Sequence, residues 1–274
     1  MLLVKSREYK MMLDQRSFRD WEEGAKRFWD EVKEFVVPLG LSFNKRLRVE
    51  NERTVQFLDT EDHTLLANGY VLRRRSRKNG NDAEYTLKYR TEDRYVAAGA
   101  NVTSPLTEEE PKFEEDIAPP FRSRYSHALT IDVEGETPTT LKEAAGLFPV
   151  LGKLRRDGQT CPPATRLMAV NGIQAFERVL VHEDDGNTSE TPLSVAGQKI
   201  SVALILWSNG RNGRPLVAEF SFRYKDKKED FEPAVAKAAR RLFSVLQRMD
   251  WAHPQAMTKT EYVYRNVSET AAGD

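Results

Sequence analysis

The sequence contains a single cysteine, Cys161, so no disulfide bond can form within the chain. Few cysteines are typical of proteins from reducing compartments, and we expect a cytoplasmic protein. No segment approaches the ~18 consecutive apolar residues of a membrane-spanning helix, so we expect no membrane partner. Lysine and arginine number 42 together, as do aspartate and glutamate. A chain without net charge gives no general reason to expect a nucleic acid partner.

Several common catalytic signatures are also absent. The sequence has no Gly-x-x-x-x-Gly-Lys phosphate loop and no dinucleotide-binding fingerprint. Its four histidines are scattered and do not show metal-ligand spacing. Cys161 lies beside Pro162 and Pro163 without an identifiable histidine partner, which argues against a catalytic thiol.

The composition is that of a folded globular chain. Charged residues make up 31% of the 274 residues and hydrophobic residues 39%, which argues against a disordered protein. No clean linker divides the chain. We expect one domain over residues 1–267, a disordered tail over residues 268–274, and a monomer or homodimer.

Hydrophobic periodicity predicts an α+β protein that is mostly antiparallel strands with helices packed outside. Helical spacing of apolar residues predicts helices over residues 17–37, 140–156 and 230–250. Residues 91–108 are polar, and we expect a loop there. The segment Asn209–Gly213 has the composition of a hairpin turn. Residues 257–265 are predicted to form the last strand.

The most informative pattern is charge on alternate residues of the predicted strands. A strand sends residues i, i+2 and i+4 to the same face. The sets that share a face are Glu8 with Lys10, Arg73 with Arg75, Lys112 with Glu114 and Asp116, and Glu219 with Arg223. Such alternation on one strand is most often a solvated sheet face, so its recurrence on several strands is what makes it informative.

Aromatic residues separate the charges in one of these strands. Phe220 and Phe222 alternate with Glu219 and Arg223. If the aromatic rings pack under outer helices, the charges point into the space that the sheet encloses. Unpaired buried charge is very costly. A barrel lined in this way therefore predicts a highly charged ligand, bound together with metal ions.

The order and spacing of these segments resemble the CYTH superfamily of triphosphate tunnel metalloenzymes. The superfamily includes inorganic and thiamine triphosphatases, class IV adenylyl cyclases and, more distantly, RNA triphosphatases. The segments that carry the resemblance, spread over about residues 4 to 265, are Ser6-x-Glu8-x-Lys10, Gln56–Asp62, Leu72–Arg75, Tyr85–Lys88, Lys112-x-Glu114-x-Asp116, Val217–Phe222 and Thr258–Tyr262.

The resemblance implies a closed, eight-stranded antiparallel tunnel that holds a triphosphate. The side chains expected to bind the substrate are Lys10, Arg73, Arg75, Lys88, Lys112, Arg223 and Lys259. The carboxylates expected to hold Mg²⁺ or Mn²⁺, which prefer oxygen ligands, are Glu8, Glu114, Asp116 and Glu219. Glu8 and Lys88 are the residues that we expect to be catalytic. The implied activity is metal-dependent hydrolysis of an inorganic or organic triphosphate.

The sequence departs from the superfamily pattern at three positions. Ser6, Trp207 and Ser221 stand where active members usually have carboxylates. Loss of carboxylates lowers metal affinity and makes the tunnel more positive. A polyphosphate- or nucleotide-binding protein without catalysis is therefore an alternative to a phosphohydrolase, and an adenylyl cyclase of the same fold is another. No base-recognition signature supports the cyclase, and zero net charge ranks RNA binding below it.

Overall fold

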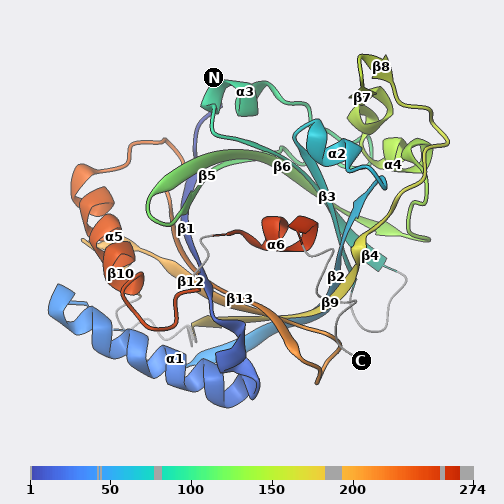
Figure 1. The fold of residues 1–274 in the computed structure, drawn as a ribbon. Coiled ribbons are helices and arrows are strands. Elements are labelled where there is room, and N and C mark those ends of the chain that lie inside the picture. Colours follow the sequence, from blue (N-terminus) through green and yellow to red (C-terminus); the bar gives the residue numbers. More distant parts are fainter. Residues whose placement is uncertain are drawn as a thin grey trace.

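Nine strands close into a barrel in the computed structural model, which Figure 1 views along the barrel axis. The structure describes residues 2–41, 43, 45–76, 82–182, 193–253 and 257–265. The predicted tail over residues 268–274 lies outside these ranges. Within them, no helix is long and apolar enough to cross a membrane.

The barrel strands lie in the order β1-β13-β12-β9-β2-β3-β4-β6-β5, and β5 returns to β1. Their bounds are β1 (Ser6–Leu13), β2 (Leu47–Asp59), β3 (Tyr70–Ser76), β4 (Asp82–Thr91), β5 (Lys112–Ala118), β6 (Arg122–Glu134), β9 (Met168–His182), β12 (Ser201–Ser208) and β13 (Pro215–Lys225). Two further two-stranded sheets pair β7 (Arg155–Arg156) with β8 (Gln159–Thr160) and β10 (Ser194–Val195) with β11 (Gln198–Lys199).

The closed barrel confirms the predicted architecture but corrects the number and direction of its strands. Nine strands are present where eight antiparallel strands were expected, and β1 pairs with β5 in parallel. Strand directions can alternate all the way around a closed ring only if the number of strands is even. A ring of nine must therefore contain a parallel pair, and here it places Glu8 opposite Asp116.

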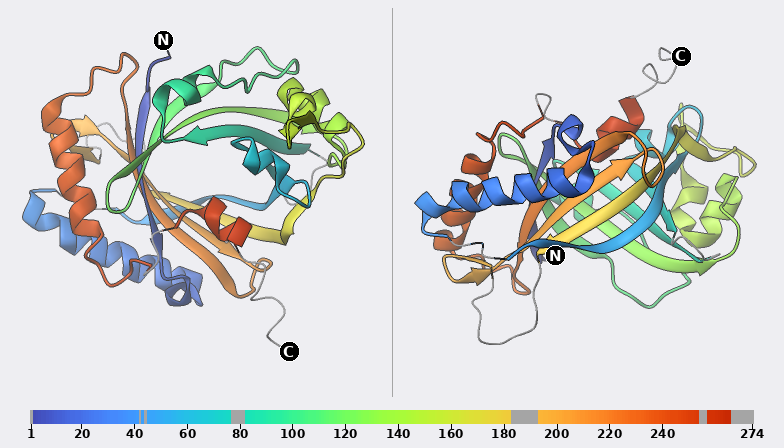
Figure 2. Two further views of the ribbon diagram at one scale, coloured as in Figure 1. Left: turned by 45° about the horizontal axis from the view of Figure 1, so that its top comes forward. Right: turned by 90° about the horizontal axis from the view of Figure 1, so that it is seen from below.

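Helices cover the outside of the barrel, as the hydrophobic periodicity predicted. Two long helices, α1 (Trp21–Val36) and α5 (Pro233–Leu246), lie against one side. Short helices cover other parts of the surface (Figure 2). These are α2 (Thr64–Ala67), α3 (Arg94–Gly99) and α4 (Leu141–Leu147).

The aromatic residues of β13 pack beneath the outer helices. Phe220 meets Phe28 of α1 edge to face, with ring centroids 5.2 Å apart. Phe222 stacks on Tyr9 at 4.7 Å, and Phe243 of α5 covers both rings. Phe220 and Phe222 are both buried. Because side chains alternate along a strand, this packing turns the charges of β1 and β13 toward the barrel interior, which confirms the predicted assignment of faces.

The predicted last strand over residues 257–265 is wrong, because this segment forms the helix α6 (Lys259–Arg265). The helix starts with reciprocal capping bonds. The Glu261 backbone N–H donates to Thr258 Oγ1 at 3.2 Å, and the Thr258 backbone N–H donates to Glu261 Oε2 at 2.7 Å. A threonine followed three residues later by a glutamate is a capping box. The sequence therefore contained the helix signal.

Viewed along the barrel axis, helix α6 lies within the outline of the ring of strands (Figure 1), and the side view places it at one end of the barrel (Figure 2). Its buried side chains Val263 and Tyr264 belong to an apolar cluster with Val55, Phe57 and Trp207 from the barrel wall. This cluster fills part of the interior with apolar side chains. The charged part of the interior lies beyond it.

Three other element boundaries differ from expectation. Helix α4 ends at Leu147, and Pro149 begins a 3₁₀ turn (Pro149–Lys153) instead of continuing the helix predicted to residue 156. Helix α1 starts at Trp21 because Asp20 caps it by accepting a hydrogen bond from the Glu23 backbone. The polar segment 91–108 contains α3, which Asp93 caps.

A buried carboxylate ties α6 to the barrel. Asp59, at the end of β2, accepts hydrogen bonds from the backbone N–H groups of Thr60 (2.7 Å), Leu65 (2.8 Å) and Leu66 (3.1 Å). The Tyr264 hydroxyl donates a fourth at 2.9 Å. Burial raises the pKa of Asp59 although these donors act in the opposite direction. The carboxylate therefore depends on its full set of donors.

We expect Tyr264→Phe to lower the free energy of unfolding by about 1–2 kcal/mol, because a buried acceptor loses a donor. Urea denaturation followed by circular dichroism measures the change. Tyr95→Phe is the control, since Tyr95 is 71% exposed on α3 and should change stability by less than about 0.5 kcal/mol. Equal effects of the two changes would contradict the structural role of Tyr264.

Candidate functional site

The barrel encloses a cavity of about 1440 Å³ that is rich in charged side chains. Thirteen lysine and arginine residues and nine aspartate and glutamate residues line it. The chain as a whole carries no net charge, so this local excess of cations is a property of the fold. All the predicted site residues except Glu8 line the cavity, and Glu8 contacts the lining residue Lys10.

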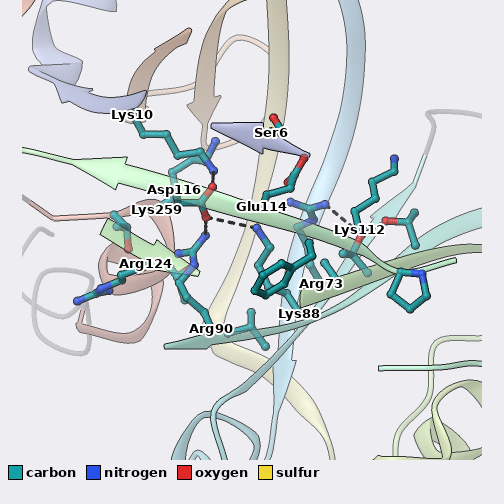
Figure 3. Close-up of a pocket in the computed structure, with 18 of the residues that line it drawn as sticks. Ser6, Lys10, Arg73, Lys88, Arg90, Lys112, Glu114, Asp116, Arg124 and Lys259 are labelled. Carbon is teal, nitrogen blue, oxygen red and sulfur yellow. Dashed lines mark hydrogen bonds and ion pairs between the residues drawn. The ribbon is translucent and has the colours of Figure 1, made fainter. Parts of the chain in front are cut away.

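The centre of the site is Asp116 on β5, which three cations surround (Figure 3). Lys10 Nζ lies 2.8 Å from Asp116 Oδ1. Arg90 Nη2 and Lys88 Nζ lie 2.7 Å and 3.5 Å from Oδ2. β1 pairs with β5, and β6 lies between β5 and β4, so the four side chains come from three neighbouring parts of the wall. We call these four residues the Asp116 cluster.

The charges of the Asp116 cluster act strongly on one another. Burial alone would raise the pKa of Asp116, but Lys10, Lys88 and Arg90 hold it well below its usual range. Burial alone would lower the pKa of Lys10, yet Asp116 and Glu8 raise it above its ordinary value. Lys88 behaves differently: burial, with help from Arg90 and Lys10, lowers its pKa to about 8. One carboxylate cannot compensate three buried cations fully.

Glu8 and Asp116 share a cation. Lys10 Nζ lies 3.0 Å from Glu8 Oε2 as well as 2.8 Å from Asp116 Oδ1. Burial would raise the pKa of Glu8, but Lys10 and Arg223 lower it overall. The lysine ammonium therefore stands between two ionised carboxylates, in the kind of position that a metal ion occupies.

The carboxylates suit a metal ion that arrives together with a ligand. No group of three or more Asp, Glu, His or Cys that could hold a metal occurs within the described ranges. Mg²⁺ is usually bound by one or two carboxylates and by the phosphates of the substrate. Glu8 and Asp116 fit this smaller requirement, because one ammonium already contacts both. The prediction of a four-carboxylate metal site remains a prediction.

Strand β13, which is the neighbour of β1, and helix α6 contribute a further ion pair to the cavity. Lys259 Nζ lies 2.7 Å from Glu219 Oε1 and 5.8 Å from the centroid of the Trp207 ring. Glu219 is buried, with 4% of its surface exposed. The helix, rather than the predicted strand, therefore places Lys259 in the cavity. Glu219, which was expected to hold a metal ion, is therefore paired with Lys259.

The remaining predicted residues lie around this centre. Glu114 lines the cavity on the same face of β5 as Asp116, and Lys112 is exposed at the start of that strand. Arg223 lines the cavity opposite Glu8 on the neighbouring strand. Arg73 and Arg75 belong to a different group farther along the wall.

A second group of charges, which we call the arginine cluster, consists of Arg53, Arg73, Arg75, Glu84 and Glu177. Glu177 Oε1 accepts a hydrogen bond from Arg53 Nε at 2.7 Å, and Oε2 accepts one from Arg75 Nη2 at 3.3 Å. Glu84 lies 3.2 Å from Arg75 Nη1. Burial would raise the pKa of Glu177, but Arg75 and Arg53 hold it well below its usual range. The cluster joins β2, β3, β4 and β9.

Sequence reasoning missed Arg53, Glu84 and Glu177. Two signals were available. Arg53 shares the inner face of β2 with Val55 and Phe57, because the three alternate along the strand. Glu177 and Arg178 interrupt an otherwise apolar run of β9, and charges in such a run indicate buried ion pairs. No local signal, however, could show that these residues meet Arg73 and Arg75.

The three positions that depart from the superfamily pattern are all buried. Ser6 and Ser221 have 3% of their surface exposed and Trp207 has 2%. Ser6 Oγ is buried without a hydrogen-bond partner among the residues that the structure describes. Trp207 Nε1 donates to Glu177 Oε2 at 2.9 Å, so the indole helps to hold the arginine cluster together.

No protein-family model and no curated protein matches this chain. Several solved structures are similar to this chain at low sequence identity. A candidate adenylyl cyclase from Hippeastrum, described as having a dominant triphosphatase activity, has a TM-score of 0.44 and 12% identity over 96% of this chain and 95% of that chain. A candidate adenylate cyclase from Bacillus halodurans has 0.39 and 10% identity over 95% and 98% of the two chains. One from Vibrio parahaemolyticus has 0.39 and 12% identity over 96% and 99%.

The alignments extend over nearly the whole of each chain. TM-scores below 0.5 do not show that these proteins share the chemistry of this chain. The architecture rests on the strand pairing of this chain, and the function has to be inferred from its cavity.

The lowered pKa of Lys88 predicts a pH-dependent affinity for anions. With a pKa of about 8, the Lys88 ammonium is present below pH 8 and is lost as the pH rises above it. A bound polyanion needs that charge, so affinity for tripolyphosphate should fall about fivefold between pH 8 and pH 9. Isothermal titration calorimetry measures the affinity. Lys88→Arg is the control for ionisation of the ligand, because arginine stays charged, and identical pH profiles would refute the prediction.

Proposed function

We propose that the protein binds a triphosphate-containing small molecule inside the barrel and hydrolyses one of its phosphoanhydride bonds. The main support is the Asp116 cluster, in which three cations converge on one carboxylate in a cavity with an excess of cations. Phosphate oxygens are recognised by the same lysine and arginine groups. We also propose a cytoplasmic protein that is a monomer or a homodimer.

The side chains of the site have separable tasks in this proposal. Lys10, Lys88 and Arg90 bind phosphate oxygens and stabilise the negative charge that develops on them in the transition state. Arg90 can engage two oxygens, because its guanidinium presents parallel N–H donors. Lys259 adds a further cation from α6. Preformed cations in a water-poor site require little reorganisation during the reaction.

The carboxylates position water and any bound cation. Glu8 is ionised beside Lys10 and can accept a hydrogen bond from an attacking water. Glu8 and Asp116 would hold Mg²⁺ or Mn²⁺ together with phosphate oxygens, and such an ion would supply charge neutralisation and activate the water. Lys10 would then turn from the two carboxylates toward the ligand.

We expect wild-type protein with Mg²⁺ or Mn²⁺ to release phosphate from at least one of tripolyphosphate, thiamine triphosphate and ATP. Lys88→Ala and Glu8→Ala should each lower the rate by about 100-fold or more, because both remove groups that stabilise the transition state. A colorimetric phosphate assay measures the rate.

The control for these variants is Lys142→Ala, which removes an exposed lysine on α4 and should leave the rate unchanged. Failure to release phosphate from any of the three compounds would refute hydrolysis. Formation of cyclic AMP from ATP would support the adenylyl cyclase alternative.

A binding protein without turnover is the second candidate. It is favoured by the buried serine positions and by Trp207, which offer no carboxylate oxygen to a metal ion. It is also favoured by the pairing of Glu219 with Lys259. In this case the cations hold the triphosphate, and the missing carboxylates prevent a stable metal site.

For a binding protein of this kind, Ser6→Glu should raise Mn²⁺ affinity about tenfold, because a third carboxylate joins Glu8 and Asp116 at the cavity wall. Mn²⁺ binding is measured by electron paramagnetic resonance. Ser76→Glu, on β3 near the arginine cluster, is the matched control. Unchanged Mn²⁺ affinity in Ser6→Glu would show that the lost carboxylate was not a metal ligand.

A further inference from the structure

The two carboxylates of the arginine cluster differ in burial and in partners. Glu177 is fully buried and is held by Arg53, Arg75 and the Trp207 indole. Removing it would leave buried arginines without a counter-ion. Glu84 instead lines the cavity, and 28% of its side chain is exposed. Glu177 is therefore a structural counter-ion, whereas Glu84 lies where a ligand can replace it.

Glu84 faces three guanidinium groups at once. Its carboxylate oxygens lie 3.2 Å from Arg75 Nη1, 3.7 Å from Arg53 Nη1 and 3.8 Å from Arg73 Nη2. Only the first of these distances is that of a hydrogen bond. The Glu84 carboxylate therefore lies near three arginines but accepts a hydrogen bond from only Arg75. Three positive and two negative charges leave the cluster with one cation in excess.

Arg73 has spare hydrogen-bonding capacity. Its Nη2 donates to Thr86 Oγ1 at 3.0 Å, but its buried Nε has no hydrogen-bond partner among the described residues. An unsatisfied buried donor is destabilising, and an oxyanion at this point would accept its hydrogen bond. Three guanidinium groups surround the Glu84 carboxylate, and a tetrahedral oxyanion in its place could accept hydrogen bonds from them.

The arginine cluster lies in line with the Asp116 cluster along one wall of the barrel. Glu84, Thr86 and Lys88 alternate on the inner face of β4, with Arg75 opposite Glu84 and Arg73 opposite Thr86. At about 3.3 Å per residue, Glu84 and Lys88 lie about 13 Å apart along the strand. Arg73 stands between them. One extended anion can therefore contact Lys88 at one end and the arginines near Glu84 at the other.

The resemblance already assigns Arg73 and Arg75 to the ligand. We propose that Glu84 competes with the ligand for these two arginines and for the neighbouring Arg53, and that it occupies the subsite of a distal phosphoryl group until the ligand displaces it. The inference rests on the proposed binding of a triphosphate in the barrel. It adds that the ligand lies lengthwise along β3 and β4. Glu84 then determines selectivity, because weakly charged anions cannot compete with it for the arginines.

Glu84→Gln tests this role, since it removes the competing charge and keeps the shape of the side chain. Affinity for tripolyphosphate, measured by isothermal titration calorimetry in EDTA, should rise about three- to tenfold. Asp132→Asn is the matched control, because Asp132 pairs with Glu84 across β4 and β6 and is an exposed carboxylate of the same cavity. It should change the affinity much less. Thermal melts confirm that both variants fold.

A double-mutant cycle tests the arginines themselves. Arg53→Lys keeps the charge but loses the planar pair of donors, so the gain from Glu84→Gln should shrink when the two changes are combined. Equal gains from Glu84→Gln and Asp132→Asn would overturn the subsite, because they would show a general effect of charge. So would a gain that is unchanged in the Arg53→Lys background.

The same experiment separates this inference from the proposed function. Phosphate release by the wild type, together with unchanged affinity in Glu84→Gln, would overturn the subsite and leave hydrolysis standing. Tighter binding by Glu84→Gln without phosphate release from any variant would support the subsite and overturn hydrolysis. Absence of tripolyphosphate binding in both the wild type and Glu84→Gln would overturn the subsite along with the binding function.

Discussion

The cost of enclosing charge in a closed barrel is the constraint on which the interior of this protein depends. A charged group moved out of water must meet a partner or lose its charge. The buried carboxylates of the barrel accordingly have cationic neighbours: Asp116 has three, Glu177 has two arginines and an indole N–H, and Glu219 has Lys259. Lysine and arginine residues outnumber aspartate and glutamate residues in the lining of the cavity. This excess of positive charge favours a polyanionic ligand.

The same constraint links the fold to the site. The outer faces of β1 and β13 are apolar and lie under α1 and α5, so the alternating residues of these strands have to face inward. Helix α6 and its apolar neighbours fill one part of the interior. Charged side chains occupy the remainder as the wall of a cavity. The covering helices and α6 thus determine where the cavity lies.

Internal ion pairs and ligand binding compete in this arrangement. Lys10 lies between Glu8 and Asp116 in the absence of ligand, and Glu84 lies among three arginines. A ligand has to replace these carboxylates with its own oxygens. An anion with several closely linked charges does so more easily than a single phosphate, since binding at one cluster holds its other charges near the next. The proposed preference for a polyphosphate rests on this competition.

The sequence by itself determined which residues face the cavity, because the two-residue period of a strand is a local property. Glu8 with Lys10, Arg73 with Arg75, and the inward charges between Phe220 and Phe222 were predictable in this way. The capping box from Thr258 to Glu261 is a local signal for α6, in a segment predicted to be a strand. A closed barrel was implied by the resemblance to the superfamily, although with eight strands instead of nine.

Only the tertiary structure decided which charges meet. The ninth strand and the parallel pairing of β1 with β5 place Glu8 beside Asp116, and no local sequence pattern encodes that register. Arg53, Glu84 and Glu177 come from three strands far apart in the sequence, and ring closure brings them to the same arginines. Side-chain direction depends on neighbours within a few residues, whereas partnership across the barrel depends on how the whole sheet closes. The side of the sheet to which each charged side chain points was therefore predictable, whereas the residue that it pairs with was not.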